Sequence, residues 1–216
     1  MARPIALLHA ALADGRSWNG FLDALGMEDV EPILVELPGH GSADDWDQSR
    51  DYADQALEIL VESLPREPVP IIGHSFGAVI ALRCAIEKPG RVSSLVAIEP
   101  PFYAALEGSF MHQKTASDLA SVKKKVDEGS LASATREFVG MWGTGQDWDD
   151  ISERDRKQMV GRMDLVMAGG DLLWKDPKGL LRAGRLEQID IPVTLVEGDK
   201  SHGSITPIID AIGRRI

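Results

Sequence analysis

Short apolar runs of strand length alternate with segments of helical periodicity along this chain, and this alternation is the sequence feature that most constrains its fold. The runs lie at residues 5–8, 33–35, 69–72, 95–98 and 193–196. Alternation of this kind is typical of parallel strands that are joined by crossover helices. The sequence therefore predicts an α/β fold with a mostly parallel five-stranded sheet flanked by helices.

Segments with apolar residues at helical spacing fill the gaps between the first four runs. They cover residues 17–25, 52–64 and 76–86, and Pro65 and Pro89 follow the second and third of them. One face of each segment can pack on a sheet, and a proline ends a helix. The third segment is apolar almost throughout, so we expect it to be the most deeply buried helix.

The pattern changes after the fourth run, where amphipathic helical stretches replace strands. We interpret residues 101–186 as a helical cap inserted into an α/β core that is formed by residues 1–100 and 187–216. The cap contains Trp142, Trp148 and Trp174. These side chains either fill a small core of the cap itself or, for one or two of them, line a substrate pocket, since such pockets are commonly lined by aromatic residues.

The charge and cysteine content narrow the classes of protein to consider. The chain has 216 residues, of which 23 are basic and 34 acidic, and its formal net charge is -11. A strongly acidic chain repels nucleic acid and anionic lipid head groups. The single cysteine, Cys84, cannot form an internal disulfide, and no apolar stretch has the length of a membrane span or the flanks of a signal peptide. We expect a cytoplasmic protein that binds neither nucleic acid nor membrane.

The motif Gly73-His74-Ser75-Phe76-Gly77 matches G-x-S-x-G, in which a serine lies on a sharp turn between a strand and a helix. An apolar run precedes the motif directly and a long apolar helix follows it, which is the setting that the motif requires. The turn should strain the backbone of the serine, and a Cβ at either glycine should collide with the packing of strand against helix. The start of the helix supplies N–H groups and partial positive charge where an oxyanion would form. The sequence thus predicts Ser75 as a nucleophile.

Two further segments resemble those of a known family. Glu36-Leu37-Pro38-Gly39-His40-Gly41-Ser42 resembles the D-x-P-G-H-G-x-S segment of many α/β-hydrolases, and Leu8-His9-Ala10-Ala11 resembles their H-G-x oxyanion loop. The resemblance extends over nearly the whole chain and is to small capped esterases or C–C hydrolases. Two positions depart from the family pattern: Ala10 replaces a glycine and Glu36 replaces an aspartate.

The resemblance implies a strand order of 2-1-3-4-5, with the first and third strands adjacent where the winding of the sheet reverses. Ligands bind at such a point. The loop after His9 and the turn at Ser75 then face each other, and the backbone N–H groups of Ala11 and Phe76 can hold a tetrahedral oxyanion. No metal or organic cofactor is implied. Structural roles are expected for His9, His40, His74 and His112.

The family places an acidic residue after the strand that corresponds to the fifth or the fourth apolar run. Asp199 fills the first place, although Ser201 stands where an aspartate often occurs, and Glu99 fills the second. Either carboxylate can instead be an ordinary loop residue or a helix cap. Both therefore remain candidates for the acid that orients a catalytic base.

The family's catalytic histidine lies in a loop after one further strand, whereas this sequence runs through a helix expected at residues 206–215 and ends at Ile216. We favour the interpretation that the histidine lies outside the given sequence. A second interpretation uses His202 as the base, although a residue so close to Asp199 has little freedom to reach Ser75. A third is a degenerate hydrolase fold that binds a ligand without turning it over.

The leading hypothesis is a serine hydrolase that acts on an ester or related carbonyl of a small, largely apolar substrate through an acyl-enzyme; a lyase on the same constellation is a variant of it. Its alternative is a catalytically incomplete module that binds a ligand or a partner. An unpaired strand at a sheet edge favours self-association, so a homo-oligomer is a further hypothesis. The residues that we expect to contact the substrate are Phe102, Tyr103, Phe110, Met111 and Trp142.

Overall fold

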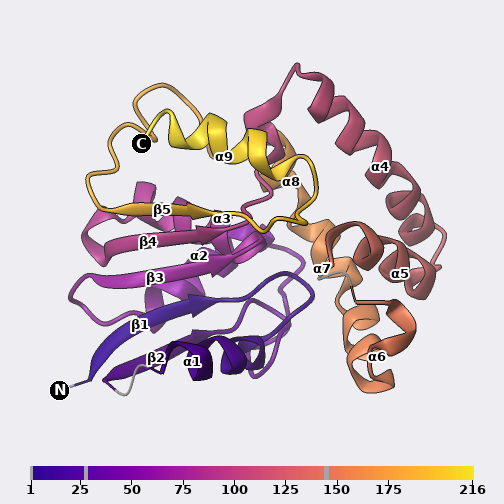
Figure 1. Ribbon diagram of the computed structural model, residues 1–216, viewed down its shortest axis with the longest axis horizontal. Helices are drawn as coiled ribbons and strands as arrows, with labels where there is room; N and C mark the ends of the chain where they lie inside the picture. Colours follow the sequence, from indigo (N-terminus) through magenta and orange to yellow (C-terminus); the bar gives the residue numbers. More distant parts are fainter. Residues whose placement is uncertain (1, 27–28, 144–145) are drawn as a thin grey trace.

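The computed structural model describes residues 2–26, 29–143 and 146–216. Its centre is a sheet of five strands in the order β2-β1-β3-β4-β5, with all neighbouring strands parallel (Figure 1). The strands are β1 (Arg3–Leu8), β2 (Val30–Val35), β3 (Val69–His74), β4 (Val92–Ile98) and β5 (Val193–Val196). The fold class predicted from the sequence and the strand order implied by the family resemblance are both confirmed.

Helices cover both faces of this sheet, because side chains of successive strand residues point to opposite faces. On one face, Leu7 and Ile72 pack with Trp18 in a small apolar cluster beneath the 3-10 helix η1 (Gly15–Trp18) and α1 (Asn19–Leu25). On the other, Leu8 and Ile71 belong to the main apolar cluster. That cluster also takes in the apolar sides of α2 (Tyr52–Ser63), α3 (Phe76–Glu87) and α9 (Ile205–Gly213).

Helix α3 is buried along nearly its whole length, as predicted. Every residue from Phe76 to Ile86 is buried, and only Glu87 at its end is not. Cys84 lies within it as a free cysteine, and burial raises the pKa of its thiol to about 11. A thiol in this state packs as a small apolar side chain.

Between β4 and β5 the chain forms a succession of helices and no strand is described. After η3 (Tyr103–Leu106) come the inserted helices, a name that we use for residues 110–175. These are α4 (Phe110–Asp127), α5 (Leu131–Trp142), η4 (Trp148–Asp150), α6 (Glu153–Gly161), α7 (Met163–Ala168) and α8 (Gly170–Lys175). Figure 1 shows them beside the carboxyl ends of the strands. The division into a core and a cap with the bounds given above stays a prediction.

The inserted helices have a small apolar cluster of their own around Val122, Ala134 and Met163. Trp142 and Trp174 do not belong to it, because both pack against the main cluster of the sheet. These two tryptophans therefore lie where the inserted helices meet the sheet, rather than in a separate core. Among the described helices, none combines the length and the apolarity needed to cross a membrane.

Candidate active site

Ser75 occupies the turn between β3 and α3, with backbone angles of φ 54° and ψ -122°. A residue with a Cβ holds such a conformation at a cost of order 1–3 kcal/mol. The backbone N–H of Ser75 donates to Ile98 O at 2.9 Å, which fixes the turn to β4. The side chain is half-buried, and its hydroxyl forms no hydrogen bond with another described residue. The strain predicted at this serine is confirmed.

The two glycines of the motif are required by close packing. A Cβ at Gly73 would lie 2.5 Å from Gly77 O, and a Cβ at Gly77 would lie 2.6 Å from His9 O. Both contacts are with backbone atoms, which cannot move aside as a flexible side chain can. The second contact also shows that the start of α3 lies directly against the end of β1.

The first turn of α3 presents an unpaired N–H beside the serine. Ser75 O accepts hydrogen bonds from the N–H groups of Ala78 at 2.9 Å and Val79 at 3.3 Å. The N–H of Phe76 has no acceptor in the part of the chain that the structure describes, as is usual for the first residue of a helix. A negatively charged oxygen at this point would be stabilised by that N–H and by the helix dipole.

The loop of residues 10–14 follows β1 and lies next to this turn. Ala10 O is 2.9 Å from His9 Nδ1 and accepts from the N–H of Ala13 at 2.9 Å. The described peptide bonds include no cis bond, so the N–H of Ala11 points away from the anchored Ala10 carbonyl. That N–H has no acceptor among residues 2–26, 29–143 and 146–216. Within the described residues, the backbone N–H groups of Ala11 and Phe76 are thus both unpaired, and they belong to two adjacent segments.

Glu36 contacts the residues on either side of this loop, His9 and Gly15. Its carboxylate accepts from the N–H of Gly15, at 3.1 Å for each oxygen, and lies 3.1 Å from His9 Nε2. Burial opposes ionisation, but the hydrogen bonds with His9 and Gly15 outweigh it and lower the pKa of Glu36. A Cβ at Gly41 would lie only 2.2 Å from the Glu36 carboxylate. The glutamate that replaces the family's aspartate fits because Gly41 leaves room for it.

His40 has a similar bracing position. Its Nδ1 is 2.9 Å from Pro38 O and its Nε2 is 2.7 Å from Ala11 O. The ring is almost fully buried, and burial lowers the pKa of His40. Both ring nitrogens lie at backbone carbonyls rather than at Ser75, and the neutral ring donates its one N–H to one of them, in line with the structural role expected for this histidine.

The structure distinguishes the two candidate acids. Glu99 follows β4 with φ 49°, and its carboxylate accepts hydrogen bonds from Ser201 Oγ and, at 3.1 Å, from the N–H of Gly198. Its backbone N–H donates to Val196 O at 2.8 Å. Asp199 is exposed, and its carboxylate has no hydrogen-bond partner within the described residues. Glu99 is thus an oriented carboxylate and Asp199 is a solvated one.

His202 lies against the inserted helices. Its Nδ1 is 2.9 Å from Ser204 Oγ, its Nε2 is 3.7 Å from Asp118 Oδ2, and its ring stacks on Trp142 with centroids 4.0 Å apart. Burial lowers the pKa of His202, and that of His74 as well. All five histidines lie in the described part of the chain, and none is hydrogen-bonded to the hydroxyl of Ser75.

Three of the residues predicted to contact substrate belong to or pack against the main cluster where the inserted helices meet the sheet, and Tyr103 is almost fully buried there. The ring of Tyr103 lies 5.7 Å from that of Trp142, and the indole nitrogen of Trp142 is buried without a described partner. Met111 is half-buried, and its Cε lies 3.9 Å from the point that a Cβ at Gly203 would occupy.

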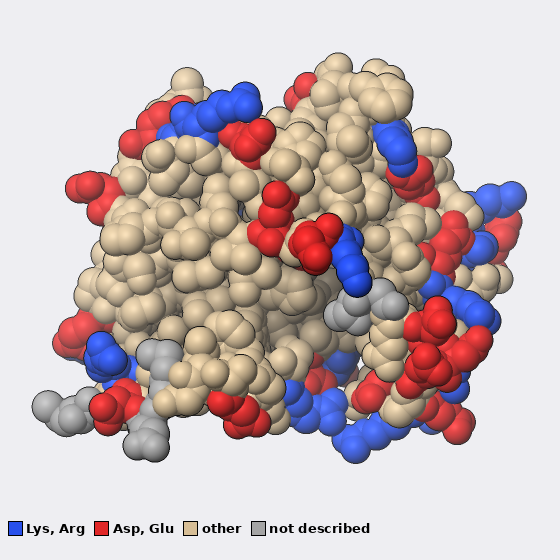
Figure 2. All heavy atoms as spheres, in the orientation of Figure 1, with Lys and Arg blue, Asp and Glu red and all other residues tan. Residues whose placement is uncertain are grey.

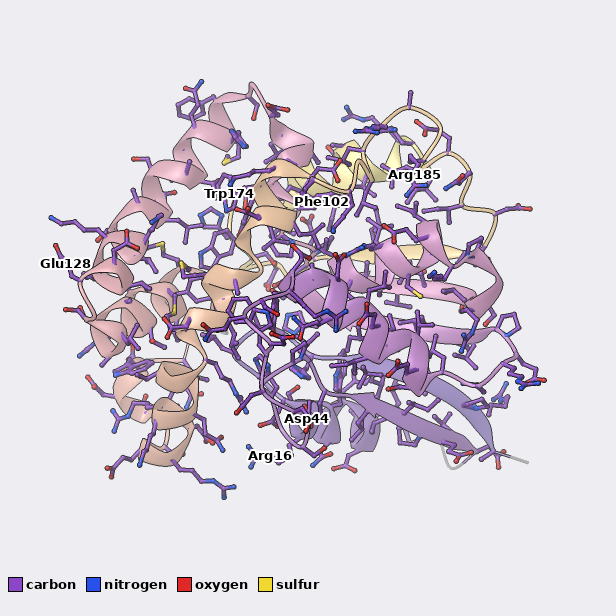
Figure 3. The ribbon with its side chains drawn as sticks, turned by 180° about the vertical axis from the view of Figure 1, so that it is seen from behind. Arg16, Asp44, Phe102, Glu128, Trp174 and Arg185 are labelled. Carbon is purple, nitrogen blue, oxygen red and sulfur yellow. The ribbon has the colours of Figure 1, made fainter. Side chains whose placement is uncertain are left out.

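The other two residues do not fit the predicted substrate surface. Phe102 has no exposed surface and packs in the main cluster, whereas Phe110 is 78% exposed at the first turn of α4. Neither complete burial nor full exposure suits the wall of an open pocket. Trp174, which was not included in the predicted set, stacks on Tyr103 with centroids 4.3 Å apart. Figure 3 shows Trp174 and Phe102 in the region between the inserted helices and the sheet.

Residues of the inserted helices contact the site at points that no motif marked in the sequence. A Cβ at Gly169 would lie 2.6 Å from the ring of Phe76, and a Cβ at Gly39 would lie 2.9 Å from Leu165 Cδ1. Arg162 reaches the loop of residues 10–14. Asp14 just before Gly15 is a typical N-cap residue, so its position at the start of a helical turn was open to prediction, but its partner Arg162 was not. Figure 2 shows the surface hollowed between the part that holds the sheet and the inserted helices.

Comparisons with known proteins agree with one another on the family to which this chain is similar. A curated relative, the pimeloyl-[acyl-carrier protein] methyl ester esterase of Methylococcus capsulatus, is 28% identical over 97% of this chain and 81% of its own. Lipase LipV of Mycobacterium tuberculosis is 30% identical, but the match covers 54% of this chain and spans only 44% of the lipase. The structure of MenH from S. aureus superimposes with a TM-score of 0.71 at 18% identity, covering 99% of this chain and 81% of MenH, which shows a shared fold.

A family model described as "Alpha/beta hydrolase family" matches residues 5–214. The match includes every strand except the first residues of β1, the turn at Ser75, and the inserted helices. Since it covers nearly the whole chain, the protein belongs to the alpha/beta hydrolase family.

Proposed function

We propose that this protein is a serine hydrolase that cleaves an ester or a related carbonyl compound through a covalent acyl-enzyme. The observation that carries the proposal is the partly buried Ser75 on a strained turn, with a hydroxyl that bonds no other described residue, beside the unpaired N–H groups of Phe76 and Ala11. Ser75 Oγ attacks the carbonyl carbon and gives its proton to a base, while the two N–H groups stabilise the oxyanion. The leaving group takes up the proton, and water then hydrolyses the acyl-serine.

Glu99 is the acid that we assign to the orientation of the base. Its two hydrogen-bond donors, Ser201 Oγ and the N–H of Gly198, hold the carboxylate at the carboxyl end of the sheet. A buried or fixed carboxylate orients an imidazole and stabilises the imidazolium that forms. Asp199 lacks such anchors, and a mobile carboxylate cannot give a base one fixed orientation.

The base itself is, in this proposal, a histidine outside the given sequence. The ring nitrogens of His9, His40 and His202 lie at carbonyl, carboxylate or hydroxyl oxygens of other residues. His202 in particular lies between Ser204 and Asp118, with its ring on Trp142. Recruiting it would require breaking these contacts, so we assign it a structural role.

The names of the curated relatives support a carboxylic ester as substrate, since they include a methyl ester esterase and a lipase. Within residues 101–186, proposed as the cap, Met111 and Trp142 supply apolar surface for the acyl or aromatic part of such a substrate, and the buried ring of Tyr103 packs against Trp142. The acidic net charge and the buried, unpaired Cys84 fit a protein of the cytoplasm.

The proposal is tested by turnover of p-nitrophenyl acetate and butyrate with the natural full-length protein and its Ser75→Ala variant. We expect the variant to lose at least roughly 10³-fold in kcat. Ser63→Ala is the matched control, because that hydroxyl only bonds Ile59 O on the exposed side of α2. Equal turnover by wild type and Ser75→Ala contradicts the proposal. Binding of the ester without turnover by either protein supports the alternative, a non-catalytic ligand-binding module.

A further inference from the structure

We propose that Arg162 is a positioning residue through which the inserted helices hold the oxyanion loop, residues 10–14, in the geometry that stabilises the oxyanion. The inference rests on the proposed function of Ser75 and of the Ala11 N–H. It assigns a role in the reaction to a residue at the junction of α6 and α7 that touches no reacting atom.

Arg162 donates hydrogen bonds to the oxyanion loop at two points. Its Nη1 donates to Leu12 O at 3.0 Å, and its Nη2 donates to Asp14 Oδ2 at 2.9 Å. Both side chains are largely shielded, with 11% of Arg162 and 7% of Asp14 exposed. A charge-assisted pair that is sheltered from water is stronger and more rigid than an exposed one. The guanidinium therefore fixes both the backbone and the side chain of this loop.

Arg162 completes a series of anchors on the loop's carbonyl groups. Ala10 O accepts from the N–H of Ala13 and lies 2.9 Å from His9 Nδ1, and Ala11 O lies 2.7 Å from His40 Nε2. Leu12 O is held by Arg162. In a trans peptide the N–H points opposite to the carbonyl, so anchoring the carbonyls sets where the N–H groups point. Of these anchors, Arg162 is the one supplied by the inserted helices.

The carboxylate of Asp14 connects Arg162 to the start of η1, because it accepts hydrogen bonds from both. Asp14 caps η1 by accepting from the N–H of Arg16 at 3.1 Å, and it also binds the Arg16 side chain. The hydrogen bond from Arg16 and that from Arg162 hold the pKa of Asp14 well below its ordinary value in spite of burial. Asp14 is therefore charged at neutral pH and available to Arg162.

The backbone of Arg162 is itself fixed by the two helices that meet there. Its N–H donates to Met159 O at 3.1 Å, and its carbonyl accepts from the N–H of Leu165 at 3.0 Å. The next turns contact the other walls of the site: Leu165 lies against Gly39, and Gly169 lies under the ring of Phe76. A movement of α6 and α7 is thus carried to the oxyanion loop and to the turn at Ser75 together.

The test compares Arg162→Gln, Arg162→Lys and Arg156→Gln in the natural full-length protein. Arg156 is a matched control: it lies on α6, but its partner Asp149 belongs to the inserted helices. For Arg162→Gln we expect kcat on ester substrates to fall on the order of 10- to 100-fold, since misplacing a catalytic group by about 1 Å costs that much, with KM changed less than about threefold. Arg162→Lys should recover part of kcat, because an ammonium can serve one of the two acceptors. Arg156→Gln should match the wild type.

A second readout, amide hydrogen exchange of residues 10–14, does not depend on turnover. It should become faster in Arg162→Gln than in Arg156→Gln, while α3 keeps its protection. The inference is overturned if Arg162→Gln keeps kcat within about twofold of wild type, or if exchange in residues 10–14 is unchanged. Failure of the proposed function would give a different result: Ser75→Ala would turn over the ester as fast as the wild type.

Discussion

Ser201 donates a hydrogen bond from its hydroxyl to the carboxylate of Glu99, although the two residues stand 102 positions apart in the chain. They meet because β4 and β5 are parallel neighbours, so the loops at their carboxyl ends adjoin. The serine hydroxyl and the N–H of Gly198 together hold the Glu99 carboxylate between these two loops.

Glu99→Gln is predicted to reduce kcat by about 10²- to 10⁴-fold, since an amide in place of the orienting carboxylate loses the ion pair and favours the wrong tautomer of the base. Asp199→Asn is the control, because that side chain is exposed and unanchored. Steady-state kinetics on p-nitrophenyl acetate decide between them. A large loss in Asp199→Asn with full activity in Glu99→Gln would reverse the assignment.

Ser75→Gly is predicted to raise the free energy of unfolding by roughly 1 kcal/mol while abolishing turnover. Glycine adopts φ 54° without the strain that serine bears there. Ser75→Ala keeps the Cβ and should show no such gain. Urea unfolding of the two variants measures the difference, and equal stability of glycine and alanine at this position would show that the turn is not strained.

Gly73→Ala and Gly77→Ala are each predicted to destabilise the fold by at least about 2 kcal/mol, because the new Cβ would meet backbone atoms. Gly140→Ala in α5 offers a matched control, since nothing lies within 4 Å of its Cβ position. It should stabilise the protein by about 0.5–1 kcal/mol through helix propensity. Denaturant midpoints test all three. A tolerated Gly77→Ala would mean that β1 and α3 are not in close contact.

The lowered pKa of Asp14 predicts that the free energy of unfolding depends on pH. Its pKa is lower in the folded protein than the ordinary value of 3.8, so the unfolded chain binds more protons below that pH. The stabilisation is complete above the unfolded pKa and is lost as the pH falls through the folded value. Asp14→Asn should therefore show a shallower loss of unfolding free energy between pH 5 and pH 2.5, about the window set by these pKa values. An unchanged slope in this variant, with Asp199→Asn as the control, contradicts the role of Asp14.

The features that could be predicted from the sequence are those set by local sterics and side-chain period. Apolar runs and helical spacing sufficed for the parallel sheet, and the motif around Ser75 indicated a strained turn with glycines on either side, as found. These depend on neighbours within a few residues. The helix expected at residues 206–215 lies at Ile205–Gly213, a shift of the size that fraying at helix ends produces.

The features that could not be predicted depend on contacts between distant segments. The bond of Arg162 to Leu12 joins residues 150 positions apart, and no periodicity marks an arginine at a junction of two helices. The choice between Glu99 and Asp199 depends on which carboxylate finds donors, and that follows from loop conformation. Phe102 and Phe110 illustrate the same limit, since hydrophobicity does not tell a fully buried ring from an exposed one.

The central claim is that the hydroxyl of Ser75 is a nucleophile, and covalent labelling tests it most directly. The natural full-length protein is treated with a fluorophosphonate, and its intact mass is measured by mass spectrometry. The protein is then digested to locate the adduct. The account predicts one adduct, on the peptide that contains Ser75, and none in Ser75→Ala. An adduct at another residue, or an unlabelled protein under conditions that label a control serine hydrolase, would contradict it.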